Sequence, residues 1–426
     1  MRNWVVGAAV LFFLSSEAGF AEQASTPVSQ DQSPGSQTSA PSAPVVMNVR
    51  VGEHPDKTRF VVELSDPAKA RVFTLSAPDR VVIDLPQVLW RVSGADHPSG
   101  KGSVKSYRYG LFRPGNSRFV IDLNQPVSPA EPMLLPPANG HGYRLVVDLM
   151  ATSQGKFDST AGWPPDLRAR ETAAERVAGD VLVPKTSVTR EKHLIVVDAG
   201  HGGLDSGTTG VNGAMEKDLV LDEALRLRNI LLKHGYGVYL TRDSDVYIPL
   251  GERVQIARTH HADLFISLHA DSNPDTSVSG ASVYTLSEAG SDREAAALAR
   301  KENQSDVIAG VDLTGANGPV ASILIGLAQR DTMNRSARFA QDLVSRLGHA
   351  TDVLPRAPHR SAGFVVLKAP DVPAVLIELG YLSNEHDCTQ MSQPAWRQGV
   401  AAAISEAVER QFHAALEGSL ATEAAE

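Results

Sequence analysis

The stretch Ile195-Val-Val-Asp-Ala-Gly-His-Gly-Gly203 decides the fold of the C-terminal half of the chain. Its apolar start predicts a buried strand, because short runs of β-branched residues are typical of parallel sheets that are covered on both faces. The glycines that follow let the backbone turn sharply around His201. We therefore expect an α/β fold in which His201 lies just past the carboxyl end of a strand, where such folds build their sites.

The residues beyond this stretch alternate between strand-like and helix-like patterns. This alternation predicts a mostly parallel sheet flanked by helices. Gly235 is expected to follow the end of the first helix as its C-cap residue. The predicted helices cover residues 217–234, 250–260, 336–347 and 396–416, and the predicted strands cover residues 193–198, 237–241, 264–269, 283–286, 364–367 and 374–378.

Four polar residues occupy positions where α/β sites are built. His201 and His269 follow or end predicted strands, Glu378 ends the last strand, and Glu216 begins the first helix. Two imidazoles and a carboxylate suit a catalytic Zn²⁺ ion, which takes three protein ligands and leaves one position for water. Taken singly, each residue also fits a structural role: a hydrogen-bonded histidine, a glutamate at a helix N-terminus or half of an ion pair.

Other common sites fit the sequence less well. The turn Gly200-x-Gly202 resembles a dinucleotide-binding loop, but Asp205 stands where that loop has its third glycine. The chain contains neither His-Glu-x-x-His nor Gly-x-Ser-x-Gly, which removes the common zincin and serine-hydrolase sites.

The N-terminal half has a different pattern, with short runs of alternating apolar residues that predict a small all-β sandwich. Three of the runs share an Arg-φ-φ-φ-Asp-Leu pattern, in which φ is apolar, and this indicates a weak internal repeat. The Arg and Asp side chains are expected to form cross-strand pairs on a solvated face. The predicted strands cover residues 46–51, 58–64, 71–75, 80–85, 104–109, 117–123 and 143–149.

Composition limits the possible partners. The chain has 426 residues and a formal net charge of −9, with an isoelectric point near 5.8. Nucleic-acid-binding proteins usually carry a basic stripe, so we expect no nucleic-acid partner. An acidic protein can still bind a neutral or zwitterionic polymer, and the length suggests two domains with linkers.

The first 21 residues have the features of a signal peptide. Arg2 gives a positive start, residues 5–14 form an apolar run too short to span a bilayer, and small residues near Ala21 offer a cleavage site. An N-terminal anchor or a buried helix is the alternative. The absence of an Arg-Arg pair favours export by the general secretory pathway. No later segment is long and apolar enough for stable membrane insertion.

The remaining boundaries follow from changes in composition. The single cysteine, Cys388, cannot form an internal disulfide and is expected to be a buried small hydrophobe. The predicted organisation is a signal peptide (1–21), a disordered linker (22–44), a β-domain (45–150), a second linker that is partly helical (151–190), a catalytic α/β domain (191–415) and a C-terminal tail (416–426).

Residues 193–415 resemble the zinc-dependent N-acetylmuramoyl-L-alanine amidases of the Gram-negative cell-separation type. Residues 45–150 resemble the AMIN domain that precedes the catalytic domain in such proteins and targets the division site. The matching stretches are the opening turn, Met215-Glu-Lys217, Leu240-Thr-Arg-Asp243, Ala262-Asp-Leu-Phe-Ile-Ser-Leu-His-Ala270, Leu367-Lys-Ala-Pro-Asp-Val-Pro373 and Ile377-Glu-Leu-Gly-Tyr-Leu-Ser-Asn384.

The resemblance implies a substrate and a set of roles. The substrate is peptidoglycan, the ligands of Zn²⁺ are His201, Glu216 and His269, and the catalytic carboxylate is Glu378. The expected reaction cleaves the amide between N-acetylmuramic acid and L-alanine, in the periplasm at the division septum. Two alternatives remain open: another zinc-dependent peptidoglycan hydrolase, such as a peptidase or deacetylase, and a non-catalytic septal wall-binding protein.

A long insertion separates the predicted strand at residues 283–286 from the predicted helix at residues 336–347. This insertion suggests that the enzyme inhibits its own activity. Residues 292–307 read as a charged, alanine-rich helix, and residues 309–325 are apolar and interrupted by glycines. The resemblance implies that this helix covers the groove and that Glu302 fills the open zinc position. It also implies release by an activator of the LytM type. Composition alone allows Glu302 to be an ordinary exposed helix residue.

Overall fold

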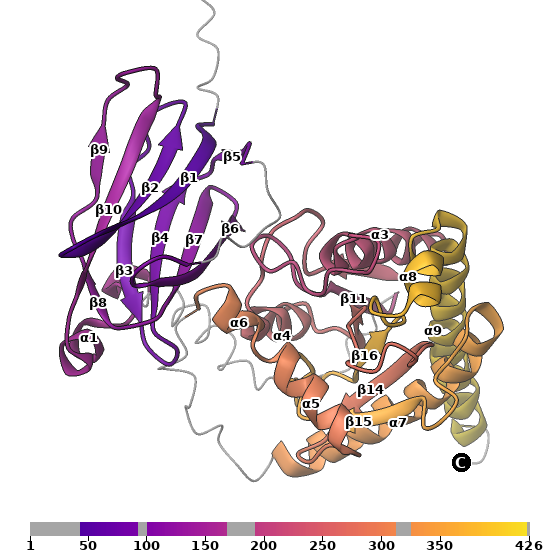
Figure 1. Ribbon diagram of the computed structural model, residues 1–426. Coiled ribbons are helices and arrows are strands. Elements are labelled where there is room, and N and C mark those ends of the chain that lie inside the picture. The colour runs from indigo at the N-terminus through magenta and orange to yellow at the C-terminus, as the bar shows by residue number, and fades with distance from the viewer. Residues whose placement is uncertain (1–42, 93–99, 168–191, 312–324, 424–426) are drawn as a thin grey trace, which may run out of the picture. The chain divides into compact units, whose positions relative to one another are not determined.

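The structure is a computed structural model that describes residues 43–92, 100–167, 192–311 and 325–423 (Figure 1). The predicted signal peptide and most of both predicted linkers lie outside these residues, as do residues 312–324 of the apolar insertion. Within the described parts of the chain, no helix combines the length and the apolar character needed to cross a membrane.

The N-terminal part is a β-domain made of two sheets (Figure 1). Its strands are β1 (Val45–His54), β2 (Lys57–Leu64), β3 (Arg71–Leu75), β4 (Arg80–Pro86), β5 (Leu89–Trp90), β6 (Val104–Arg113), β7 (Asn116–Leu123), β8 (Val127–Pro129), β9 (Met133–Leu135) and β10 (Tyr143–Ala151). One sheet has the order β5-β1-β2-β10-β8 with β9 on β10, and the other has the order β3-β4-β7-β6. A short helix, α1 (Gln154–Thr160), follows β10.

A shared apolar core joins the two sheets, as the alternating pattern predicts. Along β2 every second side chain is buried, and these include Phe60, Val62 and Leu64. Phe60 meets Phe119 of the other sheet edge-on, with ring centroids 5.6 Å apart. The predicted β-sandwich is therefore confirmed, since each sheet turns one face toward this core.

The prediction of a solvated face for the Arg and Asp pairs is partly wrong. Arg118 does pair with Asp84 across β7 and β4, with Nε 2.6 Å from the carboxylate, but both side chains are buried. The guanidinium lies over the ring of Phe112, 3.6 Å from its centroid. The aromatic ring that packs on Arg118 comes from another strand, so the sequence around Arg118 does not predict that its side chain is buried. The pair of Asp148 with Arg59, across β10 and β2, is a cross-strand pair as expected.

The C-terminal part is an α/β domain with one six-stranded sheet in the order β12-β11-β13-β16-β14-β15. All neighbouring strands are parallel except β14 and β16. The strands are β11 (Leu194–Ala199), β12 (Gly237–Leu240), β13 (Leu264–His269), β14 (Ser282–Leu286), β15 (His359–Ala362) and β16 (Ala374–Glu378). The helices are α3 (Glu216–Lys233), α4 (Leu250–Thr259), α5 (Arg293–Glu302), α6 (Ser305–Ile308), α7 (Ile325–Ala350), α8 (Glu385–Met391) and α9 (Pro394–Glu423).

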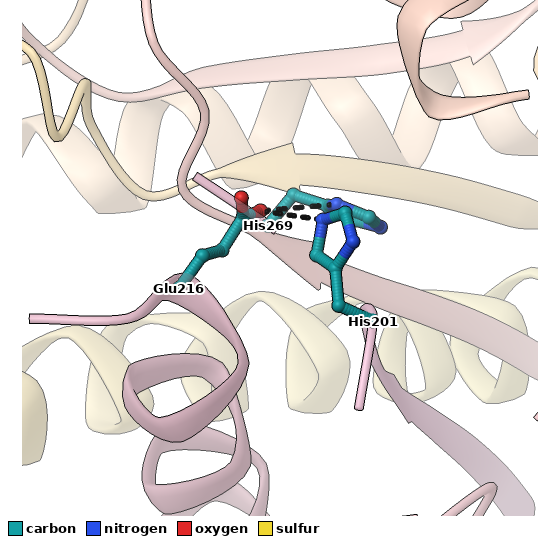
Figure 2. A group of neighbouring side chains, drawn as sticks. All are labelled: His201, Glu216 and His269. Carbon is teal, nitrogen blue, oxygen red and sulfur yellow. Dashed lines mark ion pairs between the residues drawn. The ribbon is translucent and has the colours of Figure 1, made fainter. Parts of the chain in front are cut away.

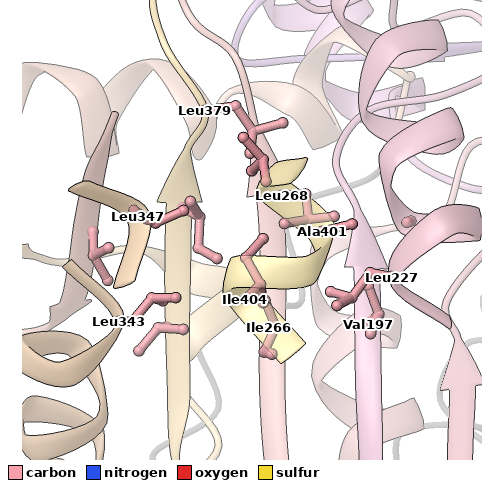
Figure 3. Close-up of a cluster of buried hydrophobic side chains, with 14 of the residues drawn as sticks. Val197, Leu227, Ile266, Leu268, Leu343, Leu347, Leu379, Ala401 and Ile404 are labelled. Carbon is pink, nitrogen blue, oxygen red and sulfur yellow. The ribbon is translucent and has the colours of Figure 1, made fainter. Parts of the chain in front are cut away.

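Helices cover both faces of this sheet, which explains the continuous apolar run in β11. Ile195 and Val197 face a core shared with α3, α7 and α9, part of which Figure 3 shows. Val196 points to the other face and packs with residues of α4 and α5. Cys388 is free and buried in the first core, as predicted. The predicted mostly parallel sheet flanked by helices is confirmed.

Two local predictions in this domain are wrong. The predicted strand at residues 364–367 is instead a 3₁₀ turn, η1 (Val365–Leu367), and the sheet uses the preceding β15. A short apolar run does not distinguish a buried strand from a buried helical turn. The helix predicted over residues 292–307 is broken into α5 and α6. The break follows from tertiary contacts, because the Asn303 side chain donates to the Gly363 carbonyl and accepts from the Val365 amide.

Candidate functional site

The strand order brings three of the predicted site residues to one edge of the sheet. β11, β13 and β16 are neighbours, so their carboxyl ends lie side by side. His269 ends β13 and is the register partner of Glu378 at the end of β16. His201 follows β11 after a single residue, Gly200, and Glu216 is the first residue of α3. The fold thereby converts positions far apart in the sequence into one cluster.

His201, Glu216 and His269 turn toward one another (Figure 2). His201 Nε2 lies 3.0 Å from Glu216 Oε1, and His269 Nδ1 lies 3.3 Å from the same oxygen. One candidate ligand atom from each residue falls within 4.8 Å of the other two. All three side chains are buried.

Their hydrogen bonding fits a metal site. Among the described residues, neither His201 Nε2 nor His269 Nδ1 makes a hydrogen bond of acceptable geometry, although both atoms are buried. Buried polar atoms normally have partners, so two such nitrogens aimed at one carboxylate oxygen form an unusual group. Two imidazole nitrogens and one carboxylate oxygen are a donor set that Zn²⁺ takes in catalytic sites. The residues present therefore fit a zinc ion.

Neighbouring groups hold the ligand side chains in place. His201 Nδ1 lies 2.9 Å from Asp205 Oδ2, which leaves Nε2 directed at the cluster when Nδ1 carries the proton. The Glu216 carboxylate accepts from the backbone amides of Thr208 and Ala270, at 2.9 Å and 2.8 Å. Partners of this kind fix the tautomer and the orientation of a metal ligand.

Electrostatics favour a cation here. Burial opposes a charge on the His201 ring, yet the carboxylates of Glu216, Asp205 and Glu302 raise the pKa of His201 well above its usual value. Burial lowers the pKa of His269 as well, but Glu302 and Glu216 outweigh this effect and raise the pKa to about 10. Carboxylates that hold protons on two imidazoles would equally stabilise a divalent ion between them.

Glu378 lies beside this cluster in a different environment. Its side chain is buried, and Oε2 accepts from the Asp271 amide at 2.9 Å, while Oε1 has no hydrogen-bond partner among the described residues. Burial raises the pKa of Glu378 to about 8, with Glu216 and Glu302 adding to the effect and His269 opposing it. A carboxylate with one anchored and one unpartnered oxygen and a raised pKa is suited to proton transfer.

Glu302 also reaches the cluster, from the last turn of α5. Its Oε2 lies 3.1 Å from His269 Nδ1 and 3.4 Å from His201 Nε2, and the side chain is buried rather than exposed. The sequence alternative of an ordinary exposed helix residue is therefore excluded. A carboxylate oxygen of Glu302 thus faces the same two nitrogens as Glu216 Oε1.

Polar contacts on both sides of Glu302 hold α5 and α6 over the site. Lys301 forms an ion pair with the buried Asp271 and donates to Thr208 Oγ1 at 3.0 Å. Ser305 donates to Asp205, the partner of His201. Glu302 and Ser305 also line a small cavity of about 10 Å³ together with His201 and His269, which is close to the space of one water molecule.

Sequence reasoning missed the residues that support the cluster. In the sequence Asp205 stands out only as a departure from a glycine motif, although its place four residues after His201 is a signal for a partner of that histidine. Two buried arginines, Arg242 and Arg253, donate to the turn that carries His201. Arg242 lies in the stretch Leu240-Thr-Arg-Asp243 that carries the resemblance, but neither arginine's local sequence indicates its acceptors, which belong to the segment from Asp198 to His201.

Comparison with known proteins shows the family to which the two parts of the chain belong. The family described as N-acetylmuramoyl-L-alanine amidase matches residues 195–410, and the family described as AMIN domain matches residues 48–149. The N-acetylmuramoyl-L-alanine amidase AmiC of Escherichia coli O6:H1 is 34% identical over 385 residues, which cover 88% of this chain and 92% of the relative. AmiC of Neisseria meningitidis serogroup B is 32% identical over 391 residues, covering 87% and 91%.

A shorter relative matches the C-terminal part. The N-acetylmuramoyl-L-alanine amidase AmiA of Escherichia coli K12 is 39% identical over 231 residues, which cover 54% of this chain and 80% of the relative. The two longer relatives match nearly the whole chain, so the similarity extends across both parts. The chain therefore belongs to the N-acetylmuramoyl-L-alanine amidase family and carries an AMIN domain before its amidase domain.

Proposed function

We propose that this amidase uses a zinc ion held by His201, Glu216 and His269 to hydrolyse the amide between the lactyl carbonyl of N-acetylmuramic acid and the amine of L-alanine in peptidoglycan. When bound, zinc polarises a carbonyl and lowers the pKa of water toward about 7. The observation that carries the proposal is the convergence on Glu216 Oε1, beside Glu378, of two buried imidazole nitrogens that make no hydrogen bond among the described residues.

Glu378 would move the proton in this reaction. Its unpartnered Oε1 would take a proton from the attacking water as the oxygen bonds to the lactyl carbonyl carbon. The same carboxyl would then give that proton to the nitrogen of L-alanine as the C–N bond breaks. The products are a lactyl carboxylic acid on the glycan and a stem peptide with a free amine. The acid then gives its proton to that amine or to water, so atoms and charge balance.

Product analysis tests the proposal. Purified peptidoglycan is digested with the full mature chain, with and without zinc after chelation, and the products are identified by mass spectrometry. We expect intact stem peptides with a free L-alanine N-terminus, formed only when zinc is present. Cleavage inside the stem, or release of acetate, would instead support one of the other zinc-dependent wall hydrolases. Wall binding without any product, by the folded full chain and by its Glu302→Ala variant alike, would support the non-catalytic alternative.

We further propose that Glu302 blocks the site until a partner displaces α5. The support is that the buried Glu302 carboxylate approaches His269 Nδ1 to 3.1 Å and His201 Nε2 to 3.4 Å. A carboxylate in the fourth position would exclude the attacking water, and α5 would exclude the glycan. An enzyme that cuts the wall needs such restraint in order not to lyse its own cell.

We propose that the partner is an activator of the LytM type and that the AMIN domain retains the enzyme at the division septum. The AMIN match and the two AmiC relatives support a periplasmic, septum-associated protein. Export would use the signal peptide predicted at residues 1–21. The apolar residues 309–325 would receive the activator, which would draw α5 and Glu302 away from the site.

A further inference from the structure

The turn that carries His201 is held in an unfavourable backbone conformation. His201 itself has a φ of +58°, and the next two residues, Gly202 and Gly203, also have positive φ values. Left-handed backbone is uncommon for a residue with a side chain, and it persists only where the surroundings enforce it. Something in the structure must therefore keep this turn in place.

Two buried guanidinium groups supply that restraint. Arg242 donates from Nε to the Ala199 carbonyl at 2.9 Å and from Nη2 to the Gly200 carbonyl at 2.7 Å. Arg253 donates from Nη1 to the Ala199 carbonyl at 2.7 Å and from Nη2 to the His201 carbonyl at 2.8 Å. Three successive carbonyls of the turn thus accept charged hydrogen bonds, which are stronger than neutral ones.

Arg242 also reaches the segment that carries the second candidate ligand. The same Nη2 atom lies 2.8 Å from the carbonyl of Lys217, the residue after Glu216. One rigid guanidinium therefore joins the His201 turn to the first turn of α3. Only 3% of Arg242 is exposed, so water cannot replace these contacts without rearrangement.

The turn has little freedom on its other side. A Cβ atom at Gly200 would lie 2.5 Å from Cε1 of the His269 ring, so the backbone already packs against the third candidate ligand. A shift of the turn would therefore disturb His201 and His269 together. Arg253 also forms an ion pair with the buried Asp198, with Nη1 2.9 Å from Oδ1.

We infer that Arg242 and Arg253 are positioning residues that set the geometry of the metal ligands by clamping the backbone of the His201 turn to the start of α3. The inference rests on the proposed zinc site. Positioning of the turn requires the several N–H donors of the planar guanidinium, and the positive charge alone does not suffice. Lysine keeps the charge but cannot donate to carbonyls of two segments at once.

The experiment compares zinc affinity and the visible spectrum of the Co²⁺-substituted protein for the full mature chain and for Arg242→Lys. Loss of an outer partner of a metal ligand typically weakens metal binding by about 10–100-fold. We expect a loss of that size in Arg242→Lys, together with an altered Co²⁺ spectrum. The matched control is Arg397→Lys, which removes a guanidinium that contacts Asp222 and the Met391 carbonyl instead of the His201 turn.

Arg253→Lys is the second variant, since an ammonium can still pair with Asp198 but loses the His201 carbonyl. It should shift both readouts in the same direction as Arg242→Lys. Wild-type zinc affinity and spectrum in both folded variants would overturn the inference, whatever their melting temperatures. Failure of both to fold while Arg397→Lys folds would also overturn it, because a purely structural role would then suffice. Absence of zinc binding in the wild type would instead remove the proposed function itself.

Discussion

At the scale of single residues, the side chains of the site differ from most buried polar side chains because selected atoms make no hydrogen bond to any residue that the structure describes. His201 uses Nδ1 for Asp205, and Glu378 uses Oε2 for the Asp271 amide, while the opposite atom of each side chain makes no hydrogen bond among the described residues. Leaving a buried polar atom unsatisfied costs about 1–3 kcal/mol. Such a cost is typical of positions that are kept for chemistry rather than for stability.

Glu378→Gln should abolish activity while leaving zinc bound. The amide keeps the shape and can still accept from the Asp271 amide, but it cannot take a proton. Loss of a general base lowers kcat by about 10²–10⁴-fold. The measurement is release of stem peptide from purified peptidoglycan, with the zinc content of the dialysed variant as the control. Hydrolysis near the wild-type rate would show that another group is the base.

Asp148→Asn should destabilise the protein at pH 7 but not in acid. Asp148 accepts from Arg59 at 2.7 Å and lies 2.9 Å from Lys57, and the hydrogen bond to Arg59 holds the pKa of Asp148 below its usual value, although burial opposes this. A lowered pKa contributes stability above the unfolded-state value of about 3.9, and this contribution disappears as the pH falls toward the folded-state value. The expected loss is about 1 kcal/mol, because both cations are partly exposed.

Chemical denaturation of the full chain between pH 7 and pH 3 measures this difference. The gap between wild type and Asp148→Asn should stay constant down to about pH 4 and shrink below it. Glu294→Gln is the control, since Glu294 forms an exposed pair with Arg360 and its change should have little effect. A gap that persists unchanged at pH 3 would mean that packing, not charge, explains it.

At the scale of elements, the segment α5–α6 is anchored at its polar residues more than by a deep apolar core. α5 buries Ala295, Leu298 and Ala299, which are mostly small side chains. Lys301 and Asn303 form its specific contacts, with Asp271 and with the backbone around Gly363. A segment held chiefly by polar contacts can be detached by a competing partner more readily than a helix of the main core.

Glu302→Ala, and deletion of residues 292–325, should each raise the basal rate on purified peptidoglycan without a partner. The substitution removes the carboxylate that faces His269, and the deletion also uncovers the site. The control is Glu294→Ala on the same helix, whose exposed carboxylate points to Arg360. Should both changes leave the basal rate at the wild-type level while zinc still binds, Glu302 is not an internal blocker.

At the scale of the whole molecule, chemistry and targeting are separated along the chain. The His201, Glu216 and His269 group, which is the one potential metal site found in the described residues, lies entirely in the amidase domain. The AMIN domain contributes a β-sandwich with its own core and is followed by the linker predicted at residues 151–190. Under the proposed function, the AMIN domain would bind the wall or septum and the amidase domain would act on the peptidoglycan.

Deletion of residues 45–150 should abolish septal enrichment without lowering the rate at which the freed amidase domain cuts purified peptidoglycan in the presence of its activator. The reason is that all candidate ligands and the candidate base lie beyond residue 190. Fluorescent fusions of the full chain, of the AMIN domain and of the deletion variant, viewed in dividing cells, measure the first effect. An AMIN fusion spread evenly around the cell would contradict the targeting role.

Local sequence patterns determined the class of each domain and the identity of the central residues. Apolar alternation predicted the β-sandwich, and the unbroken apolar run of β11 predicted a sheet that is covered on both faces. His201, His269 and Glu378 could be recognised because they stand at strand ends, and parallel strands place these ends at one edge. Glu302 was recognised through family resemblance, since its charge and spacing alone are those of a surface helix.

Tertiary structure decided the features that depend on partners far away in the chain. Asn303 ends α5 through contacts some 60 residues away, Arg118 is buried by aromatic cover, and Arg242 reaches carbonyls more than 40 residues earlier. Periodicity records only which face of an element is apolar. It does not predict which backbone carbonyl will accept a hydrogen bond from a given guanidinium, because the two groups become neighbours only when the elements pack together.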